Sequence, residues 1–461
     1  MTVAAHHARA ARSEALHAGL AEEVARPWSV DRWGRLFVIV MVVVWGAGFA
    51  LGFERSLTAL VAICLVAAIA GLWQPTIGLL GVAVLCALDT PARVYLLAGG
   101  LLRFNTFNYW LLVVMAISFP FLLRVRDIHS RLLQLLVVVL VVELFITSNL
   151  VFGLQHVLNI AAPFALLVYF APAAEGVAIW YWLGMTTGTV GALGGLQFYL
   201  QREILPEINP NAFALFPVTA LFAICLTFCA ARPRRGQLLL ILLACVNWAW
   251  VFLSGSRGGL LTATLCMALL VFLMRGVSGR MSIVVFAFVG AAVISTQFTD
   301  LQAHALHRID KLFNSDISLV SRTSGRSELA RGGWEIFREH PFGVGTGGFA
   351  DSWQKLPASM HLRFGRGVQF QSHSAWIKVL AENGIPGIVL FGVYVLSFAL
   401  VGLFARDWRL AIFGALVTAV LAAAFSTTEF QAKGLWFLTA GATTLLHRSA
   451  LRAAIRRARV E

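Results

Sequence analysis

The sequence contains few charged residues and no closely paired cysteines. Only 13% of its 461 residues are Asp, Glu, Lys or Arg, whereas 59% are hydrophobic. Its six cysteines lie inside apolar blocks and none is spaced as CxxC, which disfavours a disulfide framework or a zinc site. Apolar runs such as residues 132–144 also lack a polar face. Together these features exclude an ordinary soluble domain and predict an all-α polytopic membrane protein.

Fourteen apolar blocks are candidate transmembrane helices, if one crossing takes about 17 to 25 residues and some blocks are shorter. No small-residue cleavage site follows the first block, so we predict a retained span and not a signal peptide. The third block is interrupted at residues 89–91. The predicted spans are 36–53, 57–73, 76–89, 105–123, 132–148, 157–172, 177–200, 212–231, 237–253, 259–274, 281–297, 384–405, 410–425 and 434–446.

Arginine in the short loops predicts the orientation of the chain. With fourteen spans, the arginine-rich loops and the basic C-terminal tail all fall on one side, which the positive-inside rule makes cytoplasmic. The net charge of +14 is then a topology signal and does not indicate nucleic acid. We predict a multi-pass protein of the bacterial inner membrane with both termini cytoplasmic. Its parts are a tail (1–35), spans 1–11 (36–297), a periplasmic catalytic loop (298–383), spans 12–14 (384–446) and a basic cytoplasmic tail (447–461).

The predicted external loop concentrates arginine, histidine and glycine. Arg322 and Arg326 are four residues apart and would share one face of a helix over 321–338, where they could hold a diphosphate together. A solvated amphipathic helix is the alternative. His340 and the glycine-rich run to 349 end that helix, and a turn is favoured over a phosphate cradle because no P-loop lysine is present.

His373 begins another predicted helix, which leads through Gly384 into the twelfth span. A histidine near the membrane surface can take a proton from a hydroxyl. Arg257 lies on the same outer side between two spans, flanked by glycine and serine that leave room for a ligand, although an arginine that only tunes a helix end is the alternative. Glu143, alone inside the fifth span, is best interpreted as structural hydrogen-bonding glue.

Four motifs carry a resemblance to a known family: NPN at 209–211, SRG at 256–258, Arg326 fourteen residues before the HP that precedes GVGTGGF, and HSAWIKVLAENGIPG from His373. Over roughly 205–400 the chain resembles the bacterial O-antigen ligase and O-antigen polymerase family of membrane glycosyltransferases. It departs from the family in having Ser374 where Asn is frequent and Ala330 where Trp is frequent.

The resemblance implies transfer of a glycan from an undecaprenyl-diphosphate-linked donor to a sugar hydroxyl at the periplasmic face, either polymerising a polysaccharide or ligating it to lipid A core. It implies a metal-independent, inverting reaction with no cofactor, and the absence of a DxD-like acidic pair in the loop agrees. The implied catalytic residues are His373, Arg257 and Arg326, and the implied substrate-binding residues are Arg322, Asn211, His340 and Glu382.

The chemistry of these residue types supports that reaction independently. Arginine can neutralise a leaving diphosphate, and histidine can deprotonate the attacking hydroxyl. The rival is a transporter or flippase of lipid-linked oligosaccharides, but transporters bury their functional charges at the midplane between repeated halves. Polymerase and ligase differ only in acceptor and stay open, although fourteen spans lean towards a polymerase. Expected partners are the lipid bilayer and a chain-length regulator or flippase, and no nucleic acid.

Overall fold

The computed structural model describes residues 27–51, 53–70, 76–84, 128–151, 153–154, 156–158, 177–200, 210–230, 236–274, 277–314, 316, 318–323, 325–357, 372–404, 408–427 and 433–458. Helices account for almost all of these residues, and no β-strand occurs among them. The predicted all-α class is therefore confirmed over the described part of the chain. The fourth predicted span, most of the sixth, and residues 85–89 of the third lie outside it.

Some helices follow the apolar blocks of the sequence closely, whereas α2 and α17 begin nine residues before the predicted spans at 36 and 384. The blocks at 177–200 and 237–253 are both helical over their full predicted length. The elements are α2 (Pro27–Leu51), α3 (Phe53–Ala70), α6 (Ile128–Val142), η1 (Glu143–Phe145), α8 (Val177–Leu200), α9 (Pro210–Ala230), α10 (Gln237–Leu253), α11 (Arg257–Leu273), α12 (Val277–Gln297), α13 (Thr299–Phe313), α14 (Leu319–Arg322), α15 (Arg326–Glu339), α16 (Phe349–Lys355), α17 (Ala375–Phe404), α18 (Trp408–Thr427) and α19 (Lys433–Ala458).

Two described helical stretches are both long and apolar enough to cross a membrane, Phe213–Ala230 and Ala375–Val401. Shorter apolar helices include Gln237–Leu253, Arg257–Leu273 and Leu410–Ser426. The apolar helices thus indicate a membrane protein, whereas the count of fourteen spans stays a prediction.

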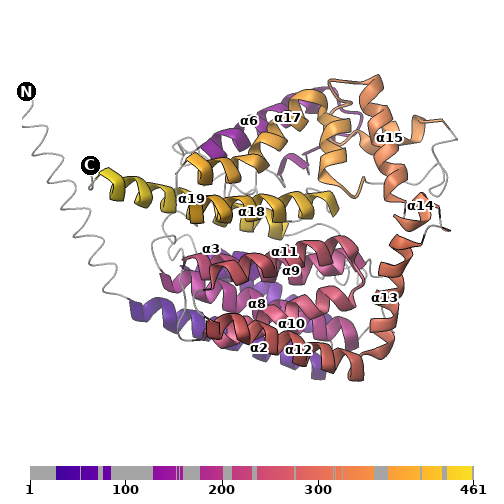
Figure 1. The fold of residues 1–461 in the computed structure, drawn as a ribbon. Coiled ribbons are helices and arrows are strands. Elements are labelled where there is room, and N and C mark those ends of the chain that lie inside the picture. Colours follow the sequence, from indigo (N-terminus) through magenta and orange to yellow (C-terminus); the bar gives the residue numbers. More distant parts are fainter. Residues whose placement is uncertain are drawn as a thin grey trace, which may run out of the picture.

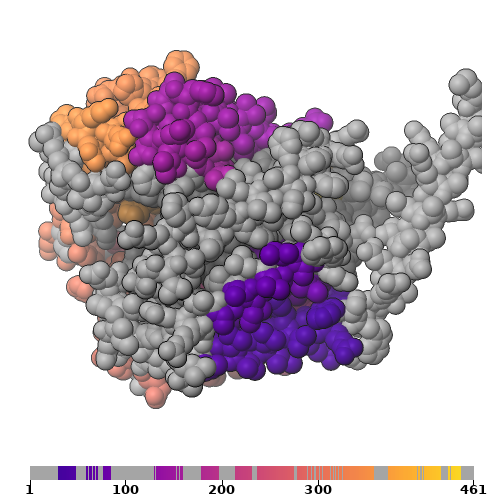
Figure 2. Space-filling model, turned by 180° about the vertical axis from the view of Figure 1, so that it is seen from behind, coloured from indigo at the N-terminus to yellow at the C-terminus, as the bar shows by residue number. Residues whose placement is uncertain are grey.

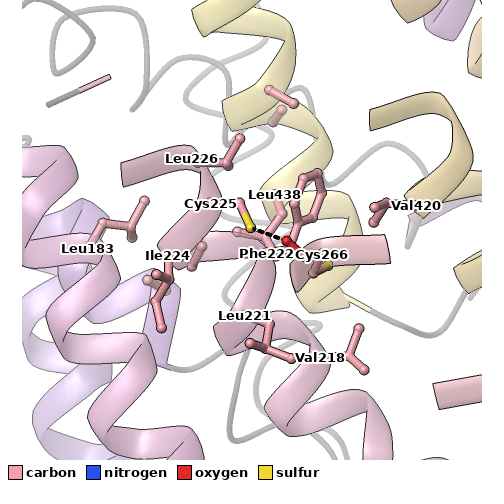
Figure 3. Packing of buried hydrophobic residues seen from close by; sticks show 14 of the residues in the cluster. Leu183, Val218, Leu221, Phe222, Ile224, Cys225, Leu226, Cys266, Val420 and Leu438 are labelled. Carbon is pink, nitrogen blue, oxygen red and sulfur yellow. Dashed lines mark hydrogen bonds between the residues drawn. The ribbon is translucent and has the colours of Figure 1, made fainter. Parts of the chain in front are cut away.

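The helices pack in two groups (Figure 1). In one, α9 lies between α8, α10 and α11, and its buried thiol Cys225 donates a 3.1 Å hydrogen bond to the Cys266 carbonyl of α11 (Figure 3). In the other, α17 packs against α6 and α18. Figure 2 shows α6 and α17 side by side on the surface, away from α2 and α3. Contacts of α11 with α18 and of α9 with α19 join the groups.

Helices α13, α14 and α15 run along one end of the bundle, opposite the arginine-rich end of α19 (Figure 1). A small apolar core fixes α15 and α16 onto the start of α17, with Leu329, Ile336, Phe349 and Trp353 buried in it. Gly333 of α15 makes this approach possible, because a side chain there would collide with Ile377 of α17. The same end of the molecule therefore holds most of the residues that the sequence marked for function.

Candidate functional site

Arg257 is the first residue of α11, and the turn before it explains its position. Gly255 has a φ of 67°, a left-handed conformation that favours glycine. Ser256 then caps α11, since its hydroxyl accepts a hydrogen bond from the Gly259 amide at 3.2 Å. This sharp turn between α10 and α11 holds Arg257 at the end of the bundle that α13, α14 and α15 cover.

Arg257 also contacts α14, because its guanidinium donates a hydrogen bond to the Arg322 carbonyl. The single helix predicted over 321–338 is wrong. Helix α14 ends at Arg322, and Gly325, with a φ of 82°, turns the chain before α15 begins at Arg326. The two arginines therefore do not share a face of one continuous helix; they lie on either side of a turn. The Nε atom of Arg322 is buried and has no hydrogen-bond partner among the described residues.

Arg326 lies in a strongly positive environment. Burial lowers the pKa of its guanidinium, and the charges of Arg257 and Arg308 lower that pKa further. Arg308, on α13, was not singled out in the sequence, although a signal for it exists. It follows Leu301 and Ala305 at helical spacing, so a cation stands on an otherwise apolar helix face. We call Arg257, Arg308, Arg322 and Arg326 the arginine cluster.

The glycine-rich run forms the turn that the sequence favoured. Gly343, Gly345 and Gly347 have φ values of 92°, 91° and 91°. The Gly345 amide donates to the Glu382 carbonyl at 2.9 Å, and the Gly347 amide donates to the Glu382 carboxylate at 2.9 Å. A side chain at Gly345 would collide with the backbone of Thr147. These amides are thus engaged by the protein itself and the turn packs tightly between α17 and the segment after α6.

A buried group of polar residues supports this turn from inside the fold. Lys378 Nζ lies 2.9 Å from His156 Nε2, and His156 Nδ1 lies 3.5 Å from the Glu382 carboxylate. At the next residue, Asn383 donates to the Glu143 carboxylate, and also to the Thr346 hydroxyl. We call Glu143, His156, Lys378, Glu382 and Asn383 the polar network. The structural role favoured for Glu143 agrees with these contacts, and both Glu382 oxygens accept hydrogen bonds from the glycine turn.

His373, which the sequence predicted to begin a helix, stands two residues before α17 in an unusual backbone conformation. Its φ of 52° is positive, which is uncommon and costly for a residue other than glycine. The flanking Ser372 holds this turn, because its hydroxyl donates to the Ser374 carbonyl at 2.8 Å. Ser372 is itself buried. Strain that the surroundings maintain is typical of functional positions, so His373 stays a candidate on independent grounds.

The remaining predicted residues lie at the same end of the molecule. Asn211 is in the first turn of α9, beside the start of α11, where Ala214 contacts Gly259. His340 is exposed and ends α15, with its amide donating to the Ile336 carbonyl. That Arg257, Arg326 and His373 surround one cavity stays a prediction.

An apolar cavity of about 640 Å³ lies between α10 and α12 and extends to the start of α13. Its lining includes Trp248, Phe252, Phe286, Phe298 and Gln302. Phe252 lies five residues before Arg257, and Gln302 lies six residues before Arg308. The cavity therefore approaches the arginine cluster along two different helices.

The apolar helices and the arginine cluster together indicate the class of protein. It is a membrane protein with positive charge at one end of its helix bundle. Residues 238–392 match the family model described as O-antigen ligase. This match supports a relation to the O-antigen ligase family, and it includes the arginine cluster, His373, Lys378, Glu382 and Asn383. The relation suggests a glycosyltransferase-like membrane enzyme that acts on glycans. No curated protein matches the chain significantly.

Proposed function

We propose that this protein transfers a glycan from an undecaprenyl-diphosphate-linked donor to a sugar hydroxyl, at the periplasmic face of the bacterial inner membrane. The observation that carries the proposal is the gathering of Arg257, Arg308 and Arg326 within the family match, where burial and then the neighbouring like charges lower the pKa of Arg326. Cations that lower the pKa of a neighbouring cation in this way favour a multivalent anion as ligand. A lipid-linked diphosphate is such an anion.

The proposed sidedness has its own support. Helices α13 to α15 lie opposite the arginine-rich end of α19, which the positive-inside rule assigns to the cytoplasm. The arginine cluster is then periplasmic, and both termini are cytoplasmic. The predicted division into spans 1–11, an external loop and spans 12–14 is part of the same proposal.

In the proposed reaction, His373 is the general base. Its imidazole takes the proton from the acceptor hydroxyl while that oxygen attacks the anomeric carbon of the donor sugar. The bond between the anomeric carbon and the phosphate oxygen breaks, and undecaprenyl diphosphate leaves with the electron pair. Attack from the face opposite the leaving group inverts the linkage. Arg257 and Arg326 neutralise the departing diphosphate, which a permanently charged fork does well and without a metal ion.

The other predicted residues have binding roles in this proposal. Arg322 offers its buried Nε to the donor, and this donor atom has no protein partner among the described residues. Asn211 and His340 contact the sugars. Glu382 also remains in the proposed substrate-binding set, but its present contacts are with the glycine turn, which favours an indirect role.

The apolar cavity between α10 and α12 suits the lipid part of the same donor. A polyprenyl chain is the apolar ligand that would extend from a diphosphate held at the arginine cluster, and the cavity approaches that cluster along α10 and α13. We therefore assign this cavity to the polyprenyl chain of the donor.

The test uses purified protein in detergent with an undecaprenyl-diphosphate-linked oligosaccharide and a glycan acceptor. We expect release of undecaprenyl diphosphate together with a lengthened acceptor, in the absence of any sealed compartment. A transporter or flippase would leave the donor intact, and that result would overturn the proposal. Supplying either a lipid-linked repeat or lipid A core as acceptor then separates a polymerase from a ligase. Co-purification with a chain-length regulator would favour a polymerase.

A further inference from the structure

Arg308 is held over the turn that carries Arg257. Ala305 and Arg308 of α13 both approach Gly255, and a Cβ atom at Gly255 would lie 3.1 Å from Arg308 Cδ and 3.5 Å from Ala305 Cα. Ala305 is fully buried at this contact. Because Gly255 has no side chain and a φ of 67°, the turn leaves the space that the Arg308 side chain crosses.

The described surroundings of Arg308 do not explain it as a structural ion pair. It forms no ion pair with a carboxylate among the described residues, and burial lowers the pKa of its guanidinium. Its charge instead acts on Arg326, whose pKa it lowers together with Arg257. Keeping a third cation next to two others opposes folding unless an anion joins them.

The change in charge during the proposed reaction suggests a role for Arg308. A glycan-linked diphosphate is esterified at both ends and carries two negative charges. When the bond from the anomeric carbon to its phosphate oxygen breaks, the electron pair stays on that oxygen and the leaving group gains a third charge. A cation beyond those that hold the donor can therefore act on this added charge, and cations aimed at developing charge lower the reaction barrier.

We propose that Arg308 is a further diphosphate ligand, which acts mainly on the charge that develops on the leaving undecaprenyl diphosphate. This inference rests on the proposed function. It assigns to α13 a direct part in the reaction beyond the residues that the sequence motifs carry. Because the interaction strengthens as the bond breaks, Arg308 affects turnover more than it affects donor binding.

The experiment compares Arg308→Gln and Arg308→Lys with the wild-type protein in detergent, at equal amounts of folded protein. We expect Arg308→Gln to lower kcat by about 10- to 100-fold, as loss of a charged hydrogen-bonding group does, with a donor KM within about threefold of normal. Inhibition by added undecaprenyl diphosphate should weaken by about tenfold or more. Arg308→Lys keeps the charge without the fork and should fall between the two.

Lys311→Gln is the matched control, since it removes one positive charge from the last turn of the same helix. Equal losses in Lys311→Gln and Arg308→Gln would overturn the proposal, as would normal kcat and normal product inhibition in Arg308→Gln. If Arg308→Gln does not fold, normal kcat in Arg308→Lys overturns it instead. If the wild-type protein neither consumes donor nor binds undecaprenyl diphosphate, the proposed function itself fails.

Discussion

The arginine cluster and the polar network hold their charges in opposite ways. In the network, Lys378 and Glu382 are 3% and 1% exposed, and His156 lies between them, so buried charges of opposite sign have partners within the fold. In the cluster, cations lie near cations, and Arg326 is affected by Arg257 and Arg308. The difference teaches that a charge buried with its partners cannot be removed without leaving those partners uncompensated, whereas like charges gathered together are suited to binding an external anion.

This comparison makes a general expectation for substitutions. Changes in the arginine cluster should lower turnover while the amount of folded protein stays constant. Changes in the polar network should lower the free energy of unfolding. His373 is close to the polar network in the chain, since it lies five residues before Lys378. Its proposed role in the reaction groups it with the arginine cluster instead.

The largest effect is expected for His373→Ala. Removing a general base costs about 10²- to 10⁴-fold in rate, so transfer from a lipid-linked donor should fall by that factor at matched membrane abundance. Loss of folded protein with normal activity per molecule would place His373 with the polar network instead. The exposed His340→Ala is a useful companion, because it should reduce donor or acceptor binding without approaching that loss of rate.

The second prediction concerns Glu382→Ala in the polar network. It removes the carboxylate that holds the Gly347 and Phe349 amides and leaves Lys378 buried without it. Breaking a buried charge pair in this way costs about 3 to 5 kcal/mol of unfolding free energy. Thermal unfolding in detergent measures it, with Glu335→Ala as control, because the Glu335 pair with Arg338 lies near the surface and contributes about 1 kcal/mol or less.

A stable Glu382→Ala protein that fails to transfer glycan would contradict the structural assignment. It would favour the substrate-binding role that the sequence predicted for Glu382. Lys378 and His156 would then be the residues of the polar network to compare with the arginine cluster.

The third prediction concerns the guanidinium fork in the cluster. Arg257→Lys and Arg326→Lys keep one positive charge each but lose the planar pair of donors that fits phosphate oxygens. We expect each to lower transfer by about tenfold or more, as the loss of a charged hydrogen bond does. Arg338→Lys, at an exposed site on α15, should transfer glycan normally. Normal rates in both cluster variants would show that the diphosphate is not held there.

Local features were predicted well from the sequence. The apolar block at 237–253 gave the bounds of α10, because apolar composition and helix length are properties of the segment itself. The turn at the glycine run followed from proline and glycine for the same reason, and so did the helix after His373. Residues that depend only on neighbours in the chain were therefore placed correctly.

Features that depend on distant contacts were missed. Helix α14 ends at Arg322, whose carbonyl accepts a hydrogen bond from Arg257, 65 residues away. The partners of Glu382 in the network come from His156 and from the glycine turn, which no local pattern connects. Arg308 was overlooked because its side chain lies over Gly255, and helices α11 and α12 separate these two residues in the sequence. Long-range packing, and not local propensity, decided these positions.

The smallest predicted effect tests how the fold delivers His373 to the reaction. The Ser372 hydroxyl bonds to the Ser374 carbonyl and holds His373 at a φ of 52°, a conformation that costs about 1 to 3 kcal/mol without support. Ser372→Ala removes a hydrogen bond that contributes about 1 kcal/mol, so His373 should spend less time in its working conformation. We expect kcat to fall by up to about tenfold while the donor KM stays unchanged, since the arginine cluster is intact.

Ser372→Thr keeps the hydroxyl and should restore kcat, which a role in packing alone would not produce. Ser282→Ala is the matched control, because its hydroxyl bonds to a carbonyl of α12, far from His373 in the chain, and is exposed. A normal kcat in Ser372→Ala would mean that the backbone at His373 holds its conformation without the hydroxyl. In that case the packing of α17 against α15, through Ile377 and Gly333, would be what positions the imidazole.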